Sequence, residues 1–145
     1  MNVATICLAS LVASVAASAQ APSPSDVLKH VVFERTKALL EGDSDTYRRY
    51  TAATFLSTGT DGTAKICAPN ILERIPREEA FFEILDLKIK VEGETASVGY
   101  RLVVFESREE GSPYYFARRT ENYVRNSDGW KLVAEREVEI PDSLY

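Results

Sequence analysis

The chain has 145 residues and a formal net charge of −5, from 22 acidic and 17 basic side chains. This length suits one domain with a single core, and the acidic balance excludes a protein that neutralises a nucleic-acid backbone, so we expect no nucleic-acid partner. One histidine and two cysteines are too few for a zinc cage, and no glycine-rich phosphate-binding loop is present. We therefore expect neither a metal nor another cofactor.

The N-terminus has the features of a secretory signal peptide. Residues 1–19 carry no charged side chain and end in Ala-Ser-Ala, a small-residue cleavage pattern before Gln20. Because no Lys or Arg precedes the apolar run, an uncleaved membrane anchor is the alternative, but the run is shorter than the ~20 residues that a spanning helix needs. We expect cleavage, a short leader over 20–25, one domain over 26–145, and a secreted or periplasmic protein with no membrane contact.

Cys67 is the one cysteine that remains once the signal peptide is removed. A single cysteine forms no internal disulfide, and no nearby histidine or carboxylate pair marks it as a nucleophile. We interpret it as a small buried apolar residue.

Three helices are predicted before the main sheet. Ser25 suits the N-cap of the first helix, and Gly42 ends it. The helical period places Arg35 in the middle of an apolar stripe and His30 on the opposite, polar face. The predicted helical ranges are 26–41, 44–54 and 69–75.

A hairpin and four long strands follow the first two helices. Residues 55–66 turn at Asp61-Gly62, a strong hairpin signal. Apolar and polar residues then alternate along four segments, which cover 84–92, 95–107, 114–125 and 130–140. In the first segment one face is predicted to carry Leu85, Leu87, Ile89 and Val91.

The second of these strands is apolar on both faces near its end. Val103 and Phe105 lie opposite the main apolar set, and a monomer would leave them in water. We therefore predict a homodimer that pairs through the outer face of the sheet.

Four short segments carry a family resemblance: residues 38–43 (ALLEGD), 91–96 (VEGETA), 119–125 (RTENYVR) and 128–133 (DGWKLV). In their order and spacing they resemble the nuclear transport factor 2-like superfamily, in its SnoaL-like branch. The resemblance implies an α+β cone, in which a curved antiparallel sheet wraps on three N-terminal helices and leaves a pocket at the wide end. Members include polyketide cyclases, ketosteroid isomerases, dehydratases, epoxide hydrolases and non-catalytic binders, so the fold does not settle the chemistry.

The chain departs from the catalytic members of this family at one place. Isomerase-type members carry a carboxylate near the end of the second helix, where this chain has Ala-Thr-Phe at 53–55. The one histidine, His30, is predicted on the polar face of its helix. Neither an isomerase base nor an inward histidine is therefore expected.

The resemblance also gives a facing for the last strands. It points Trp130 and Leu132 toward the helices, and a period of two extends that face to Arg136. It also places Thr120 inward, with the other residues of the same parity. The predicted polar lining of the pocket is Arg35, Tyr50, Tyr100, Arg118, Asn122 and Arg136.

This lining is rich in cations and poor in bases. Guanidinium forks pair well with carboxylates, so the predicted ligand is a small apolar or anionic molecule. The alternative is that the arginines pair with Glu106, Glu121 and Glu135 along the sheet, or extend their charged ends to the rim of the pocket.

The sequence thus favours an exported small-molecule-binding domain. Two other classes stay open: a small cofactor-free enzyme of isomerase, dehydratase or cyclase type, and a protein-interaction domain that docks through its convex face. An inward carboxylate with a raised pKa beside a tyrosine would favour the enzyme.

Overall fold

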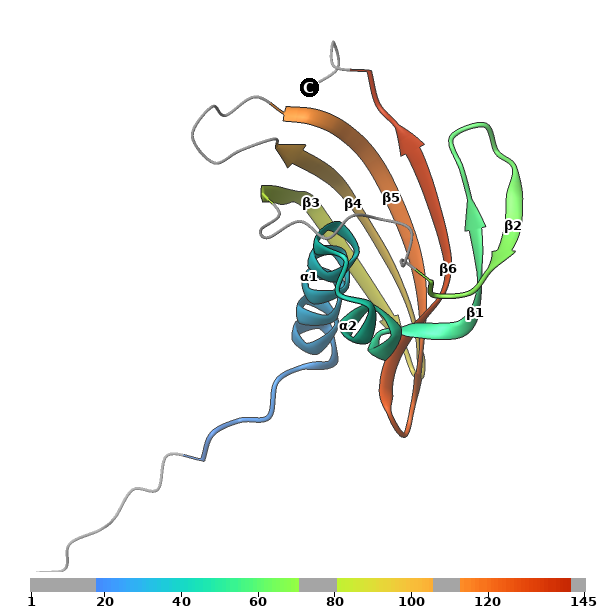
Figure 1. The fold of residues 1–145 in the computed structure, drawn as a ribbon. Helices are drawn as coiled ribbons and strands as arrows, with labels where there is room; N and C mark the ends of the chain where they lie inside the picture. Colours follow the sequence, from blue (N-terminus) through green and yellow to red (C-terminus); the bar gives the residue numbers. More distant parts are fainter. Residues whose placement is uncertain (1–17, 71–80, 106–112, 142–145) are drawn as a thin grey trace, which may run out of the picture.

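The computed structural model describes residues 18–70, 81–105 and 113–141. In these ranges two helices precede six strands, and both helices lie inside the curve of one sheet (Figure 1). The elements are α1 (Pro24–Glu41), α2 (Ser44–Arg49), β1 (Thr51–Thr58), β2 (Ala64–Cys67), β3 (Phe81–Glu92), β4 (Thr95–Phe105), β5 (Pro113–Asn126) and β6 (Gly129–Glu139). Neither of these two helices is long and apolar enough to cross a membrane.

The first helix is confirmed, with a different start. Ser23 is its N-cap, not Ser25, since the Ser23 side chain accepts a hydrogen bond from the backbone N–H of Asp26 and Pro24 opens the helix. Gly42 ends the helix in the left-handed region, with φ of 79°.

The second helix is shorter than predicted, because its last residues join the sheet instead. It ends at Arg49, and Thr51 already pairs with β6. Sheet pairing has overridden the local helical pattern there. The third predicted helix falls mainly on residues outside the described ranges.

The sheet is mixed, not wholly antiparallel as predicted. Its strand order is β2-β1-β6-β5-β4-β3. Each neighbouring pair is antiparallel except β1 and β6, which run parallel. The predicted hairpin over 55–66 is confirmed as β1 and β2, and the four long strands are confirmed as β3 to β6.

Two irregularities in the strand pairing decide which side chains face the helices. In β6, Ala134 pairs with Asn122 and Leu132 pairs with Tyr123, so Val133 is an extra residue. Side-chain parity changes there: Trp130 and Leu132 are buried, whereas Arg136 is exposed. The predicted inward facing of Arg136 is therefore wrong.

A similar irregularity lies in β3 between Leu85 and Lys88, where Asp86 has φ of 53°. As a result Ile84, and not Leu85, joins the residues of β3 that pack on the core. The predicted alternation is confirmed for the rest of that set, which comprises Leu87, Ile89 and Val91.

The facing of β5 is opposite to the prediction. Residues that are directly paired across two strands share a face, and the apolar face of β4 is fixed by its burial against α1. Because Tyr100 pairs with Arg119 and Val98 pairs with Glu121, the alternate residues of β5 that include Arg119, Glu121 and Tyr123 are buried.

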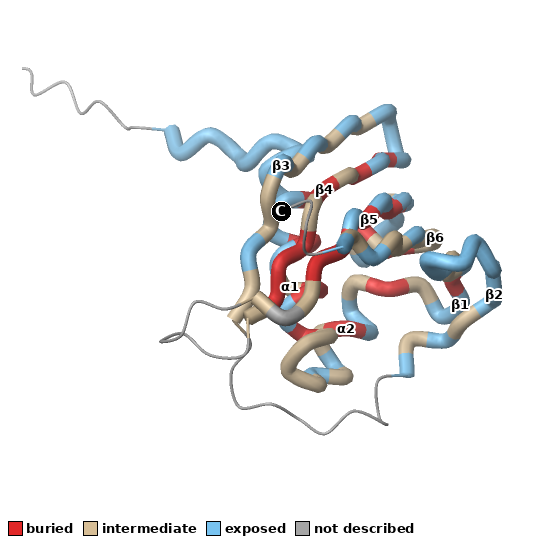
Figure 2. The backbone as a smooth tube through the Cα atoms, turned by 90° about the horizontal axis from the view of Figure 1, so that it is seen from above, coloured by how far each residue is buried: buried red, intermediate tan, exposed pale blue. Residues whose placement is uncertain are grey.

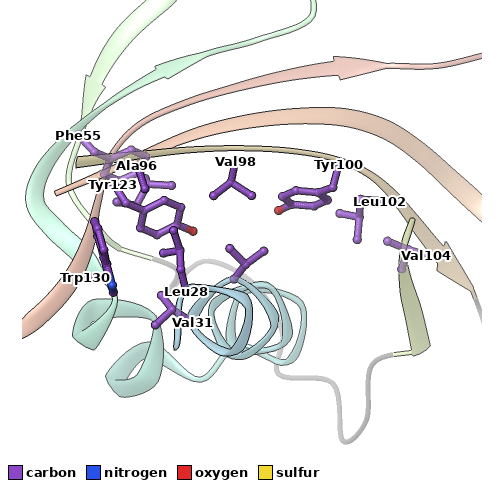
Figure 3. Close-up of a cluster of buried hydrophobic side chains, with 12 residues drawn as sticks. Leu28, Val31, Phe55, Ala96, Val98, Tyr100, Leu102, Val104, Tyr123 and Trp130 are labelled. Atoms are coloured by element: carbon purple, nitrogen blue, oxygen red, sulfur yellow. The ribbon is translucent and has the colours of Figure 1, made fainter. Parts of the chain in front are cut away.

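The core lies between α1 and the central strands. Leu28, Val31 and Val32 of α1 form one buried cluster with residues of β4, β5 and β6. Figure 2 marks the buried stretches along the backbone, and Figure 3 shows Leu28 and Val31 beside the sheet. Trp130 of β6 lies in this core, which confirms its predicted place. Cys67 is half-buried and packs against the core from β2.

Val103 changes the argument for a homodimer. It lies opposite the main apolar face of β4, yet it is only 1% exposed within one chain. A second copy is therefore not needed to cover it, and of the two residues only Phe105 keeps part of its surface open.

Candidate functional site

A network of charged and hydroxyl side chains is buried where α1 meets β5 and β6. Arg35 of α1 is its centre and is fully buried. Its Nη1 lies 3.1 Å from Glu121 Oε1, and its Nη2 lies 2.9 Å from Glu135 Oε2. Its Nε donates to Thr51 Oγ1, and its Nη2 donates also to the Tyr47 hydroxyl. Every nitrogen of this guanidinium is thus hydrogen-bonded.

Glu121 of β5 is equally enclosed. Its Oε1 accepts hydrogen bonds from Arg35 and, at 2.8 Å, from the Tyr100 hydroxyl. Its Oε2 accepts one from the Tyr123 hydroxyl at 2.6 Å. Figure 3 shows both tyrosines projecting from the sheet to the side where α1 lies. The carboxylate is therefore held by three donors from three elements.

The two tyrosines are fixed as neutral donors. Burial, and after it the negative charge of Glu121, raises the pKa of Tyr100 well above the usual tyrosine range. The same two causes raise the pKa of Tyr123. Both hydroxyls therefore keep their protons at neutral pH.

Arg119 of β5 forms a second centre. Its Nε donates to Glu137 Oε2 at 2.6 Å, its Nη2 pairs with the same carboxylate, and Tyr115 donates to the other oxygen of Glu137. Its Nη1 is 3.9 Å from Glu121 Oε1, too far for a hydrogen bond. This buried Nη1 has no hydrogen-bond partner in the described part of the chain.

The charges of the network compensate one another. Burial lowers the pKa of Arg35, but the combined attraction of Glu121 and its other neighbours outweighs burial and raises that pKa above the usual arginine range. Two guanidinium groups face three carboxylates, from Glu121, Glu135 and Glu137. With all five ionised, the network carries one excess negative charge, so its cations need no added anion.

Of the six predicted pocket residues, the structure brings Arg35 and Tyr100 into this network. Tyr50 ends α2 and packs half-buried against the core. The other three, Arg118, Asn122 and Arg136, are exposed on the outer face of the sheet. The sequence therefore predicted the wrong side for half of the lining.

The interior holds carboxylates that the predicted lining lacked. The alternative that Arg35 pairs with Glu121 and Glu135 is confirmed, while Glu106 lies outside the described residues. The signal for Glu121 was the spacing of Arg119, Glu121 and Tyr123 on one face of β5, which becomes visible only once that strand is in register with β4. The description of the interior as poor in bases is thus wrong.

No metal centre is seen in the part of the chain that the structure describes. No group of three or more His, Cys, Asp or Glu side chains there could hold a metal ion. The buried carboxylates of the network are held by arginine and tyrosine donors instead.

Several solved structures share this α+β fold, although no family model and no curated protein matches this chain. An NTF2-like protein from Cytophaga hutchinsonii is 14% identical with a TM-score of 0.65, over 82% of this chain and all of that one. The CaMKII hub of S. rosetta is 20% identical with a TM-score of 0.67, over 83% and 100% of the two chains.

An NTF2-like protein with a cystatin-like fold from Novosphingobium aromaticivorans gives a similar result. It is 13% identical with a TM-score of 0.64, over 79% of this chain and 80% of that one. The chain has the nuclear transport factor 2-like fold. At these identities the likeness concerns the fold alone.

Proposed function

We propose that this protein is an exported small-molecule-binding domain whose ligand places an oxygen atom against Nη1 of Arg119. The observation that carries the proposal is the contrast between the two buried arginines. Arg35 uses all of its nitrogens, whereas Arg119 has one buried donor without a partner. Leaving such a donor unsatisfied costs ~1–3 kcal/mol, and a ligand acceptor would recover that cost.

The charge of the interior favours a neutral ligand. Because three carboxylates already face two arginines, a further anion would add to an existing excess of negative charge. Core side chains of β4, among them Leu102, lie on the same face of the sheet as Arg119. The ligand class that fits best is an apolar molecule with a carbonyl or hydroxyl oxygen. This class of ligand also suits the SnoaL-like branch that the sequence resembles.

An enzyme is the second candidate, because Glu121 is an inward carboxylate beside two tyrosines. Three donors take up three of the roughly four acceptor sites of this carboxylate, however. Because Glu121 is also 0% exposed, a substrate proton has no open path to the remaining site. Binding therefore fits the geometry better than proton abstraction. A protein-interaction domain is the third candidate. Its support is the name of one structural neighbour, the CaMKII hub of S. rosetta.

The binding experiment compares neutral ketones with hydrocarbons of the same carbon skeleton. A series of aliphatic and aromatic ketones is titrated against the isotope-labelled protein and followed by NMR. We expect saturable binding of some ketones and weaker binding of their hydrocarbons. Arg119→Met should lower ketone affinity about tenfold or more, and Arg119→Lys, which keeps a cation, should lose less.

Arg136→Met is the matched control, because it removes the same charge from the exposed face of β6. It should leave ketone affinity unchanged. Circular dichroism of each variant checks that the fold is kept. If Arg119→Met binds the ketones as tightly as the unaltered protein does, a buried water satisfies Nη1 and the proposal fails.

Export is the other part of the proposed function. The uncharged apolar run and the small residues before Gln20 support a mature protein that begins at Gln20 and is secreted or periplasmic. The test is the intact mass of the protein recovered from the medium or periplasm of an expressing bacterium. A mass that includes residues 1–19 would mean a tethered domain instead.

A further inference from the structure

A depression of about 570 Å³ is lined by residues of β3, β4 and β5, and it borders Tyr100 and Arg119 of the buried network. Its polar side chains include three cations from three neighbouring strands: Lys88 of β3, Arg101 of β4 and Arg118 of β5. Its apolar lining includes the half-buried Ile140 and the nearly buried Val103 and Phe116. The ligand proposed above would meet Nη1 of Arg119, whereas the charges considered below are those of Lys88, Arg101 and Arg118.

The strand register places like charges directly opposite one another. Arg101 and Arg118 are cross-strand partners in β4 and β5. Like charges in such a pair are destabilising. A bound anion between the two guanidinium groups would relieve this repulsion.

Glycine keeps the centre of the depression open. Gly99 is the partner of Lys88 in β3 and of Thr120 in β5. A Cβ added at Gly99 would meet no atom within 4 Å. The floor between these two strands is therefore backbone, with room above it for a ligand.

The cations of the depression are only partly neutralised. Arg101 Nε donates to Asp86 Oδ2 at 2.6 Å. Neither Lys88 nor Arg118 has an ion pair within residues 18–70, 81–105 and 113–141. Three cations and one carboxylate leave an excess of two positive charges, on a protein whose net charge is −5. Such a local field attracts anions.

We propose that this depression binds an organic anion: a carboxylate on an apolar body. The exposed guanidinium of Arg118 offers two parallel N–H donors to the carboxylate, which is the strongest geometry for this pairing. Lys88 supplies a second cation from the neighbouring side. The half-buried Ile140 offers the apolar body its contact, beside the register partners Val103 and Phe116, which are 1% and 5% exposed.

The probe is 3-phenylpropionate, and its neutral amide, 3-phenylpropanamide, is the matched ligand. Each is titrated into the isotope-labelled protein at low salt, and the backbone amide signals of Gly99 and Thr120 are followed by NMR. We expect saturable shifts with the carboxylate, a far weaker response to the amide, and loss of affinity as salt is added.

Variants locate the site. Arg118→Gln and Lys88→Gln should each weaken carboxylate binding about tenfold or more, since each removes a charge-assisted hydrogen bond. Lys90→Gln is the control, because Lys90 lies two residues along β3, outside the depression, and is paired with Glu92. The Lys90→Gln variant should bind the carboxylate with the same affinity as the unaltered protein.

Three outcomes would overturn the proposal: equal binding of the acid and the amide, equal weakening by Lys90→Gln and Arg118→Gln, or no saturable shift up to about 10 mM. Sedimentation of the same samples adds a fourth. If Arg118→Gln changes the oligomeric state, the depression is an interface between copies of the chain. Ketone binding at Arg119 is measured separately, so that one proposal can fail without the other.

Discussion

Arg35 and Glu121 form a fully buried ion pair of 3.1 Å between two residues that are 86 positions apart in the sequence. The pair joins the middle of α1 to the middle of β5. Because both groups have left water, each depends on the other and on the surrounding hydroxyls for its stabilisation. The position of α1 on the sheet is therefore coupled to this one contact.

Removal of Arg35 should destabilise the fold strongly. Arg35→Met leaves the buried Glu121 and the half-buried Glu135 without their cation, which should lower the free energy of unfolding by ~3–5 kcal/mol. Urea denaturation measures the loss. Lys90→Met, which breaks an exposed pair with Glu92, is the control and should cost less than ~1 kcal/mol. Equal losses in the two variants would contradict the role of the buried pair.

Adding Glu121→Gln to Arg35→Met should restore part of the lost stability. The second change removes one of the two charges that the first leaves uncompensated. The measurement is a double-mutant cycle in urea. Strict additivity of the two single losses would mean that the groups act independently in spite of their 3.1 Å contact.

Trp130 should contribute as a buried aromatic residue. Its side chain is 3% exposed and lies in the core of Figure 3. Trp130→Ala should lower the free energy of unfolding by ~3–5 kcal/mol. Val124→Ala, at an exposed position of β5, should change it by about 0.5 kcal/mol or less. A loss under about 1 kcal/mol for the tryptophan variant would place its indole in solvent.

The protein should lose stability at alkaline pH through its buried tyrosines. The pKa values of Tyr100 and Tyr123 are raised in the folded state by burial and then by Glu121. A raised pKa gives stabilisation that is complete below the usual tyrosine pKa of about 10, and this stabilisation is lost as the pH rises above it.

Ultraviolet absorbance of tyrosinate, followed together with circular dichroism, tests this. The two buried tyrosines should ionise only as the fold is lost, and Tyr100→Phe with Tyr123→Phe should remove that late, cooperative part of the titration. Ionisation of all tyrosines near pH 10 with the fold intact would count against the buried network.

A homodimer through the outer face stays a prediction. With Val103 already buried in one chain, the contact would centre on Phe105, which is half-buried at the end of β4. Light scattering at micromolar concentration should show a dimer, and Phe105→Ser should dissociate it. A monomer before any substitution would rule the dimer out.

The sequence by itself determined the elements with strong local signals. Alternation in β4 and β6, the turn at Asp61-Gly62 and the stop at Gly42 each depend on neighbours within a few residues. The helical period likewise placed Arg35 among apolar residues, and the structure confirms that it is buried. Such patterns are local, so a single sequence contains them in full.

Tertiary structure decided which polar groups face the interior. A strand has a side-chain period of two, so one extra residue moves every later side chain to the other face. Val133 does this in β6 and sends Arg136 outward. On β5, register with β4 selects Arg119 and Glu121 over Arg118 and Asn122. The place of a bulge and the register of a pair depend on the partner strand, which the local sequence does not contain.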